Sequence, residues 1–432
     1  MKVSVEELGA CKRVLRVELP PESVRPKVEE VYRQLERTVK IPGFRKGKAP
    51  RRLLEARFRD EVRSEVVRDL VPATYRQALE ESHLTPISEP EVEEIQFEED
   101  KPFVFKATFE VKPEFEVKDY RRVVVSKEPL QVTEEEVDRA LELMRERAGE
   151  YLSMEGWPAL RGDLVYLDFE GLVEGRPFKG GKGENQPLLL GSQGLLPGFD
   201  EKVIGLGKGE SKAFGLDIPE DFPRKDLAGN RVTLKITVKE IKKKRLPQLD
   251  DDFAKEFGGC GTLRELREKV RCDLLRQKEK AQEMELKGKI VEKVVDAHSL
   301  EVPEALVEAH LRRMVSQGIR RLAAQGVDVK GLAQDPEALR GHFREAALKE
   351  AKATLVLEAI ADKEGIQVSE EELAKEVEAI AASVNLEPKA MRTYLEGQGR
   401  WEAFRAELRE QKAVDFLYAQ ARVVEGGGLI VL

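Results

Sequence analysis

Apolar and polar residues alternate in four stretches of this chain, which predicts strands with one buried face. The alternation runs through residues 15–19, 103–111, 165–169 and 232–238. A period of two places successive side chains on opposite faces of a sheet. The last two stretches are separated by short apolar runs and glycine turns, so a small and mostly antiparallel sheet is expected there, with one short helix around residues 199–204.

Other stretches repeat their apolar residues every three or four positions, as one face of an α-helix does. Residues 28–39 and 53–70 have this pattern near the N-terminus, and residues 306–322 have it later. Three pairs have the spacing of capping boxes, in which a hydroxyl and a glutamate bond each other's backbone N–H groups: Thr133 with Glu136, Thr262 with Glu265, and Ser369 with Glu372. Asp335-Pro336 is a further helix start. At least five helices are expected between Thr262 and Val424.

These elements predict a multidomain α+β protein, and the charge-rich helices favour an elongated one. We expect an α+β domain at residues 1–112, a connector at 113–150, an antiparallel β-domain with a short helix at 151–245, and a long all-α domain at 246–432. The apolar tail after the hinge at Gly426 can either dock on the body or stay disordered.

Composition supports this organisation and indicates the cellular compartment of the protein. Charged residues make up 36% of the 432 positions and aromatic residues only 6%, which is typical of solvent-washed helices rather than one thick core. The three cysteines show no CxxC spacing, which favours neither a disulfide framework nor a zinc site. The N-terminus lacks the apolar segment of a signal peptide, and no run of eighteen apolar residues occurs. A cytoplasmic protein is expected.

The stretch Gly43-Phe44-Arg45-Lys46-Gly47-Lys48-Ala49-Pro50 differs from any core segment. It places a phenylalanine beside three cations on a glycine-hinged loop. Residues 40–68 hold ten cations and four carboxylates, a local charge of +6 in a chain of net charge −8. This reversal of sign indicates either docking on an anionic surface with Phe44 as an apolar anchor, or simply a solvated helix face.

The octapeptide resembles the ribosome-docking signature of the bacterial trigger factor family, the chaperones of the nascent-chain tunnel exit. The family pattern is G-F-R-x-G-K-x-P. The resemblance implies that Gly43, Phe44, Arg45, Lys46, Gly47 and Lys48 contact the large ribosomal subunit.

A second resemblance lies in the central domain, around Leu195-Leu196-Pro197-Gly198-Phe199. The spacing is similar to that of FKBP-type prolyl isomerases, in which an aromatic cup grips the substrate proline. The resemblance implies walls at Phe169 and Phe178, a rim at Leu195 and Leu196 where a backbone amide binds the substrate carbonyl, and a floor at Phe199.

The same resemblance places Phe222 and Ile236 at the closing side of the pocket. Phe199 stands where the family has tryptophan, and Lys179 where it commonly has aspartate. The role of that acid therefore does not transfer. Without the resemblance, these apolar residues would be read as core, and for Leu188 and Ile236 the choice between pocket and core stays open.

Other chemistry is not supported by the sequence. Gly43–Lys48 has too few residues between its glycines for a P-loop, and Ala49 stands where a magnesium-binding hydroxyl belongs. The four histidines lack paired-ligand spacing, and Asp250-Asp251-Asp252 favours a helix start over a calcium loop. No cofactor or metal is expected.

The combined prediction is an ATP-independent chaperone that docks beside the tunnel exit, holds nascent and unfolded chains, and isomerises prolyl bonds. The expected partners are the large ribosomal subunit, through protein and rRNA, and unfolded polypeptides. A homodimer is left open, and no membrane partner is expected. Two rivals remain: an isomerase that the helices only dimerise, and a nucleic-acid-binding protein that uses the basic tract.

Overall fold

The structure is a computed structural model, and it describes most of the chain. The described residues are 1–39, 44, 50–98, 101–173, 175–192, 196–220, 222, 224, 226–325 and 336–426. Contacts divide the chain into two compact units. One comprises Met1–Lys127 with Met284–Leu432, and the other is Glu128–Glu283.

The N-terminal part of the first unit is a four-stranded antiparallel sheet. Its strands are β1 (Lys2–Glu7), β2 (Lys12–Leu19), β3 (Glu91–Gln96) and β4 (Phe103–Glu110), in the order β1-β2-β4-β3. The register places Val17 opposite Phe105, and the odd-numbered residues of β4 are buried. The alternation at residues 15–19 and 103–111 is therefore confirmed as half-buried strand.

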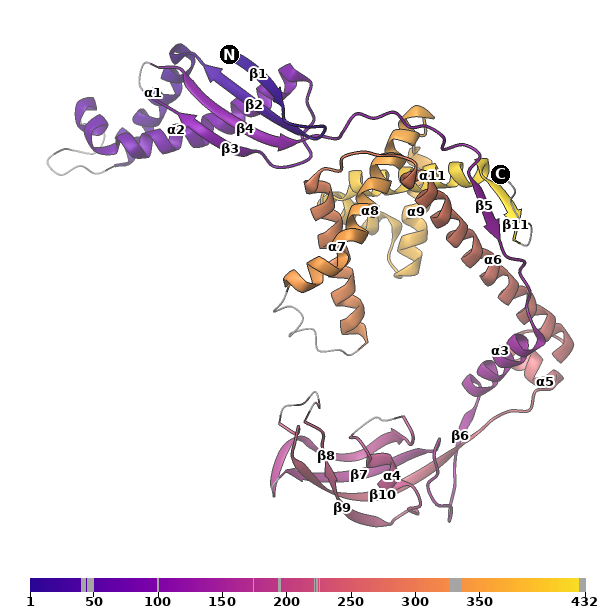
Figure 1. The fold of residues 1–432 in the computed structure, drawn as a ribbon. Helices are drawn as coiled ribbons and strands as arrows, with labels where there is room; N and C mark the ends of the chain where they lie inside the picture. Colours follow the sequence, from indigo (N-terminus) through magenta and orange to yellow (C-terminus); the bar gives the residue numbers. More distant parts are fainter. Residues whose placement is uncertain are drawn as a thin grey trace. The chain divides into compact units, whose positions relative to one another are not determined.

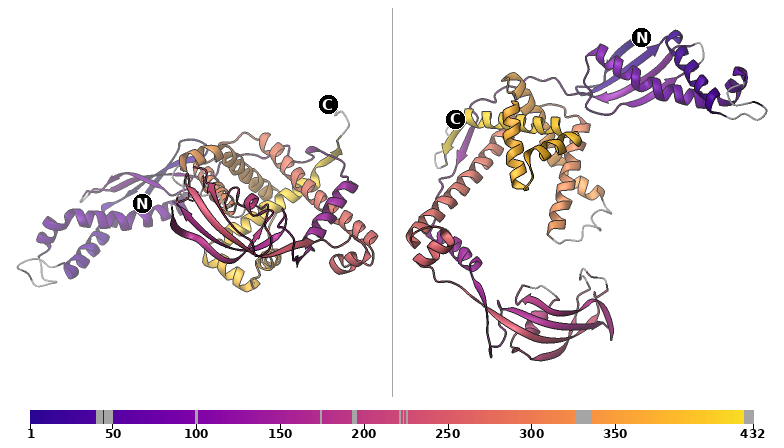
Figure 2. Two further views of the ribbon diagram at one scale, coloured as in Figure 1. Left: turned by 90° about the horizontal axis from the view of Figure 1, so that it is seen from below. Right: turned by 180° about the vertical axis from the view of Figure 1, so that it is seen from behind.

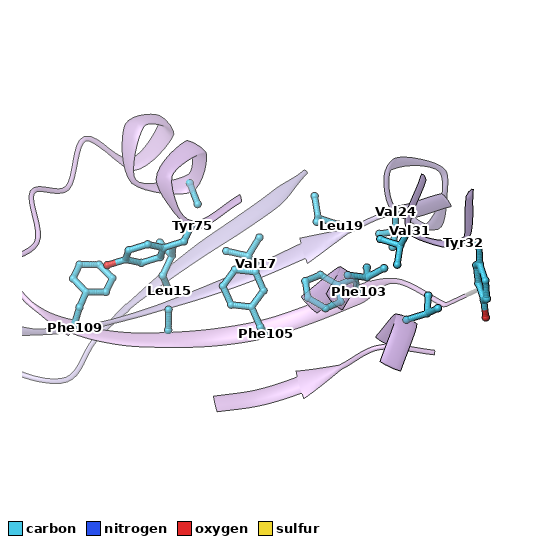
Figure 3. Packing of buried hydrophobic residues seen from close by; sticks show 14 of the residues in the cluster. Leu15, Val17, Leu19, Val24, Val31, Tyr32, Tyr75, Phe103, Phe105 and Phe109 are labelled. Carbon is cyan, nitrogen blue, oxygen red and sulfur yellow. The ribbon is translucent and has the colours of Figure 1, made fainter. Parts of the chain in front are cut away.

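Two helices pack on one face of this sheet (Figure 1), α1 (Pro21–Thr38) and α2 (Arg51–Ser82). The shared core contains Leu15, Phe105 and Phe109, and Tyr75 of α2 meets the Phe109 ring edge-on at 5.7 Å (Figure 3). Both helices extend beyond the predicted stretches. The backbone leaves helical geometry once inside α2, at Phe58 (φ −124°), and helical periodicity alone does not reveal such a kink.

The central sheet is antiparallel, as predicted. Its strands are β6 (Glu150–Ser153), β7 (Leu164–Val173), β8 (Arg176–Leu189), β9 (Ser211–Asp217) and β10 (Arg231–Arg245). Their order is β6-β10-β7-β8, with β9 also paired to β10. The short helix α4 (Phe199–Val203) packs on the sheet through Phe199 and Val203. The long strand β10 holds the sheet together, since it pairs with three others.

A small helical module flanks this sheet in sequence on both sides. Helix α3 (Glu134–Arg147) begins with the predicted capping box of Thr133 and Glu136. It packs on α5 (Asp251–Phe253), the π-helical turn Ala254–Gly258 and the start of α6 (Leu263–Asp296). Asp250 caps α5 by accepting the Phe253 N–H at 2.9 Å, so the predicted helix-start role of the aspartate cluster is confirmed.

The C-terminal part of the first unit is helical, as expected. Beyond α6, its described helices are α7 (Glu304–Ala324), α8 (Pro336–Lys363), α9 (Glu370–Ser383), α10 (Pro388–Gly397) and α11 (Trp401–Gln420). The chain then forms β11 (Arg422–Glu425), which pairs in parallel with β5 (Val124–Lys127). Figure 1 labels this pair, and the right view of Figure 2 shows it from behind. The predicted tail beyond Gly426 lies outside the described residues.

The predicted capping boxes differ in how fully they form. At Ser369 and Glu372 both reciprocal bonds are present. At Thr262 the prediction is half wrong. The hydroxyl accepts the Glu265 N–H at 3.3 Å, but the Glu265 carboxylate accepts the Gly261 N–H at 2.8 Å rather than that of Thr262. The glutamate side chain reaches one residue further and bonds a different backbone donor.

Candidate functional site

The first predicted wall of the pocket, Phe169, lies in the middle of the central sheet. Strand β7 places it opposite Ile236 of β10 on one side and Gly183 of β8 on the other. Phe169 is half-buried, whereas Ile236 is fully buried. A side chain at Gly183 would collide with the Phe169 ring, because an added Cβ would lie 2.5 Å from Phe169 Cε1. Glycine at position 183 therefore leaves the space that the ring occupies.

The second predicted wall, Phe178, depends on glycines in the same way. Its ring lies against Gly171 of β7 and Gly181 of β8, where an added Cβ would be 2.9 Å from Phe178 Cε1 in each case. The guanidinium of Arg224 is 5.4 Å from the ring centroid. Glycine in a strand often marks a place where another group approaches the backbone closely. These strand glycines are a sequence signal that the pocket prediction did not use.

The predicted floor, Phe199, opens α4 directly after Gly198. Gly198 has a φ of +76°, which L side chains rarely adopt. Phe199 is only 1% exposed, and its ring meets the Phe214 ring edge-on at 5.8 Å. Phe214 was not predicted as part of the site. Leu188 is also buried, at 5% exposure. Phe199, Leu188 and Ile236 thus belong to the core beneath the half-buried residues.

A cavity of about 480 Å³ adjoins this core. It is lined by two predicted site residues, Leu196 and Phe222, together with Arg161, Gly191, Pro197, Gly198, Asp200, Glu201 and Ile204. Phe169 and Phe178 are not on its wall, but they pack with Leu196 and Phe222 against the same apolar cluster. Leu195 lies outside the described residues. Six of the seven predicted pocket residues therefore share one apolar cluster.

The carboxylates near the cup are engaged in hydrogen bonds and ion pairs. Asp168 accepts the Asn185 backbone N–H at 2.7 Å and pairs with Lys239 at 3.0 Å. The Asn185 bond and then the Lys239 bond hold the pKa of Asp168 below its usual value. The pKa of Asp226 is lowered by its bond to Arg224. Among the described residues, no group of three or more histidine, cysteine or acidic side chains could hold a metal ion.

Of the predicted docking residues, only Phe44 is described. Its side chain is 45% exposed, which suits an apolar anchor for a partner. Gly43, Arg45, Lys46, Gly47 and Lys48 lie outside the described residues. Arg51, the first residue of α2 after this segment, stacks on the Tyr32 ring at 3.4 Å and bonds Glu55 at 2.7 Å.

Known families match almost the whole chain. The family described as bacterial trigger factor protein matches residues 1–144, and its C-terminal part matches residues 262–419. The trigger factor of Halothermothrix orenii is 38% identical over 96% of this chain and 98% of its own length. The chain belongs to the trigger factor family.

The trigger factors of Bacillus cytotoxicus and Moorella thermoacetica are 38% and 36% identical over 96% and 98% of this chain, and over 98% and 96% of their own lengths. A solved structure of a trigger factor chaperone, reported under promiscuous substrate recognition in folding and assembly, is similar with a TM-score of 0.54. It is 24% identical and covers 97% of this chain and 99% of that chain. This likeness supports the fold.

The central domain matches a further family, the FKBP-type peptidyl-prolyl cis-trans isomerases, over residues 156–239. This trigger factor family member is therefore a ribosome-associated chaperone with prolyl isomerase activity. Both resemblances inferred from the sequence are confirmed. Within the described residues, no helix is long and apolar enough to cross a membrane.

Proposed function

We propose that Phe169, Phe178, Leu196 and Phe222 form the surface that grips the substrate proline. The observation that carries this assignment is their partial burial on one apolar cluster. All four pack against a core whose members include Phe199 and Ile236, yet each keeps part of its surface accessible. Fully buried residues cannot touch a substrate without moving. Phe199, Ile236 and Leu188 therefore act as the support that fixes the exposed residues.

The reaction suits an apolar site without an acid, base or metal. Rotation about an amide bond faces a barrier of about 18–20 kcal/mol, and uncatalysed X-Pro exchange takes about tens to hundreds of seconds. The twisted transition state loses the charge separation of the planar amide. A dry apolar surface thus favours the twisted form over the planar form, which water solvates better. In this scheme a backbone N–H at the rim, where the family resemblance places Leu195 and Leu196, holds the substrate carbonyl.

In this proposal, the residues of this chain that dock on the ribosome are Phe44, Arg45 and Lys46. Gly43, Gly47 and Lys48 shape the loop. The exposed Phe44 side chain supports an apolar anchor. The charge of +6 over residues 40–68 supports an anionic target, which at the tunnel exit includes rRNA beside ribosomal protein. Cytoplasmic location follows from this partner.

The oligomeric state off the ribosome is a separate question. Sedimentation of the purified chain distinguishes a monomer from a homodimer.

Two sets of variants test these assignments separately. Phe169→Ala lowers kcat/KM on a proline peptide and leaves ribosome pelleting unchanged. Replacing Phe44, Arg45 and Lys46 with alanine abolishes pelleting and leaves peptide isomerisation unchanged. Wild-type turnover in the first variant contradicts the pocket, and retained pelleting in the second contradicts the docking loop.

Deleting residues 151–245 tests the rival in which isomerisation is the sole purpose. The shortened chain should still suppress aggregation of an unfolded client. Loss of that activity in a folded deletion variant favours the rival.

A further inference from the structure

The carboxylate of Asp200, beside the cavity, has one bonded oxygen and one buried oxygen without a partner among the described residues. Asp200 is the second residue of α4, and its Oδ2 accepts the Gly191 backbone N–H at 2.7 Å. Its Oδ1 is buried and has no hydrogen-bond partner among the residues that the structure describes. Burying an acceptor without a partner costs free energy. A hydrogen-bond acceptor at this position therefore needs a reason beyond packing.

The other end of this bond, Gly191, is held firmly. The preceding residue, Leu190, donates its N–H to the Asp163 carbonyl at 3.0 Å and accepts the Gly162 N–H at 2.8 Å. Gly191 has a φ of +97°, and an added Cβ would lie 2.8 Å from Arg161 Cγ. The turn that follows β8 is thus anchored to the body of the domain. The Asp200 carboxylate extends that anchor to α4.

The chain between these two anchored points carries Leu196, and Gly191, Leu196 and Asp200 all line the same cavity. Leu196 also accepts the Phe199 N–H at 3.1 Å, so its position is coupled to the start of α4. A charge-assisted bond to a backbone N–H is stronger than a neutral one. The bond from the Gly191 N–H to Asp200 consequently fixes the start of α4, and through the Phe199 N–H it fixes the adjoining Leu196.

We propose that Asp200 is a positioning residue for prolyl isomerisation. Its carboxylate fixes α4 to the turn after β8, so that Leu196 lies in the orientation that meets the substrate. The inference rests on the proposed pocket. Asp200 itself takes no part in bond rotation. Its contribution is the geometry of the rim.

The experiment compares Asp200→Ala with Asp200→Asn in the full-length chain. Asparagine keeps one acceptor oxygen for the Gly191 N–H, whereas alanine keeps none. We expect Asp200→Ala to lower kcat/KM on a proline peptide by about tenfold, and Asp200→Asn to stay within about threefold of wild type. The amide proton shift of Gly191, measured by NMR, should move upfield in Asp200→Ala only.

Glu210→Ala is a matched control in the same domain. Its carboxylate also accepts a glycine N–H, that of Gly207 at 3.0 Å, but Glu210 is not on the cavity wall. This variant should retain wild-type turnover. If Asp200→Ala does not fold, Asp200→Asn and the Gly191 shift decide the matter: a wild-type shift with a tenfold loss of turnover overturns the proposal.

The remaining outcomes are equally decisive. Wild-type turnover in folded Asp200→Ala overturns the positioning role, as does an equal loss in both Asp200 variants. If Phe169→Ala is inactive while Asp200→Ala is fully active, the pocket assignment stands and only this inference fails. If Phe169→Ala is fully active, the pocket assignment itself fails.

Discussion

Replacing Gly183 with alanine tests whether the Phe169 ring is a wall of the proline pocket. The added Cβ would lie 2.5 Å from Phe169 Cε1 and 2.8 Å from Gln186 Cγ. Ordinary contact begins at 3.4 Å, so the nearest ring atom is 0.9 Å too close. The ring must move, because Gly183 and Phe169 are paired across β7 and β8 and the backbones cannot separate without breaking the ladder.

The expected effect has two parts. Overpacking should lower the free energy of unfolding by about 1–3 kcal/mol. A well-placed aromatic contact is worth about 0.5–1.5 kcal/mol beyond its buried area. If that contact is made with the twisted prolyl bond, its loss lowers kcat/KM by about two- to thirteenfold. The measurement is protease-coupled isomerisation of a proline peptide, at a temperature well below the thermal midpoint of the variant.

Gly207→Ala is the control for adding a methyl group to this domain. Its nearest neighbours are Glu210 side-chain atoms at 3.6–3.9 Å, which is ordinary contact, so activity should not change. In the double variant Gly183→Ala/Phe169→Leu, the smaller side chain should restore the thermal midpoint without restoring turnover. Wild-type kcat/KM in folded Gly183→Ala would refute the placement of Phe169 in the pocket.

Three further predictions concern other parts of the chain. Tyr75 has a buried hydroxyl without a partner among the described residues, and burial raises its pKa to about 12. Tyr75→Phe should therefore raise the free energy of unfolding by about 1 kcal/mol. A lower free energy of unfolding in urea denaturation would contradict this. The hydrogen bond from Lys412 is the main cause that lowers the pKa of Glu372 from 4.5 to about 2. A lowered pKa stabilises the fold above pH 4.5, and this stabilisation disappears as the pH falls toward 2. Glu372→Gln should therefore reduce the fall of the thermal midpoint between pH 4.5 and 2. An unchanged dependence of the midpoint on pH would refute the pairing of Glu372 with Lys412. Burial raises the pKa of the Cys11 thiol to about 11, so iodoacetamide at pH 8 should label exposed Cys272 well before Cys11, and equal labelling would contradict the burial.

Local signals in the sequence predicted the elements of the fold well. The boxes at Thr133 and Ser369 form as expected because both bonds of each box span only three residues. Alternation located β2, β4, β7 and β10, since each buries one face. Family resemblance supplied the pocket residues, and the structure brings those it describes onto one cluster.

Burial and long-range packing could not be predicted in the same way. Phe169 and Phe199 are both assigned to the pocket by the family resemblance, yet one is half-buried and the other fully buried. The difference depends on α4 packing against Phe214 of β9, which no short window contains. The sequence predicts a connector at residues 113–150 but not its packing partners. Val137 and Leu141 of α3 pack with Phe253 and Leu266, which follow residues 151–245 in the chain.

The position of Phe253 in the chain also determines when α3 can pack during synthesis. Val137 precedes Phe253 by 116 residues, and chains grow at about 5–20 residues per second. Helix α3 therefore waits on the order of ten seconds for the residues that bury its apolar side, while the isomerase domain is completed in between. The two ends of that domain then meet where Arg145 Nε donates to the Pro247 carbonyl at 3.0 Å. The helical module can thus pack only after the isomerase domain has been synthesised. A ribosome that stalls before residue 253 would leave α3 without its main buried contact.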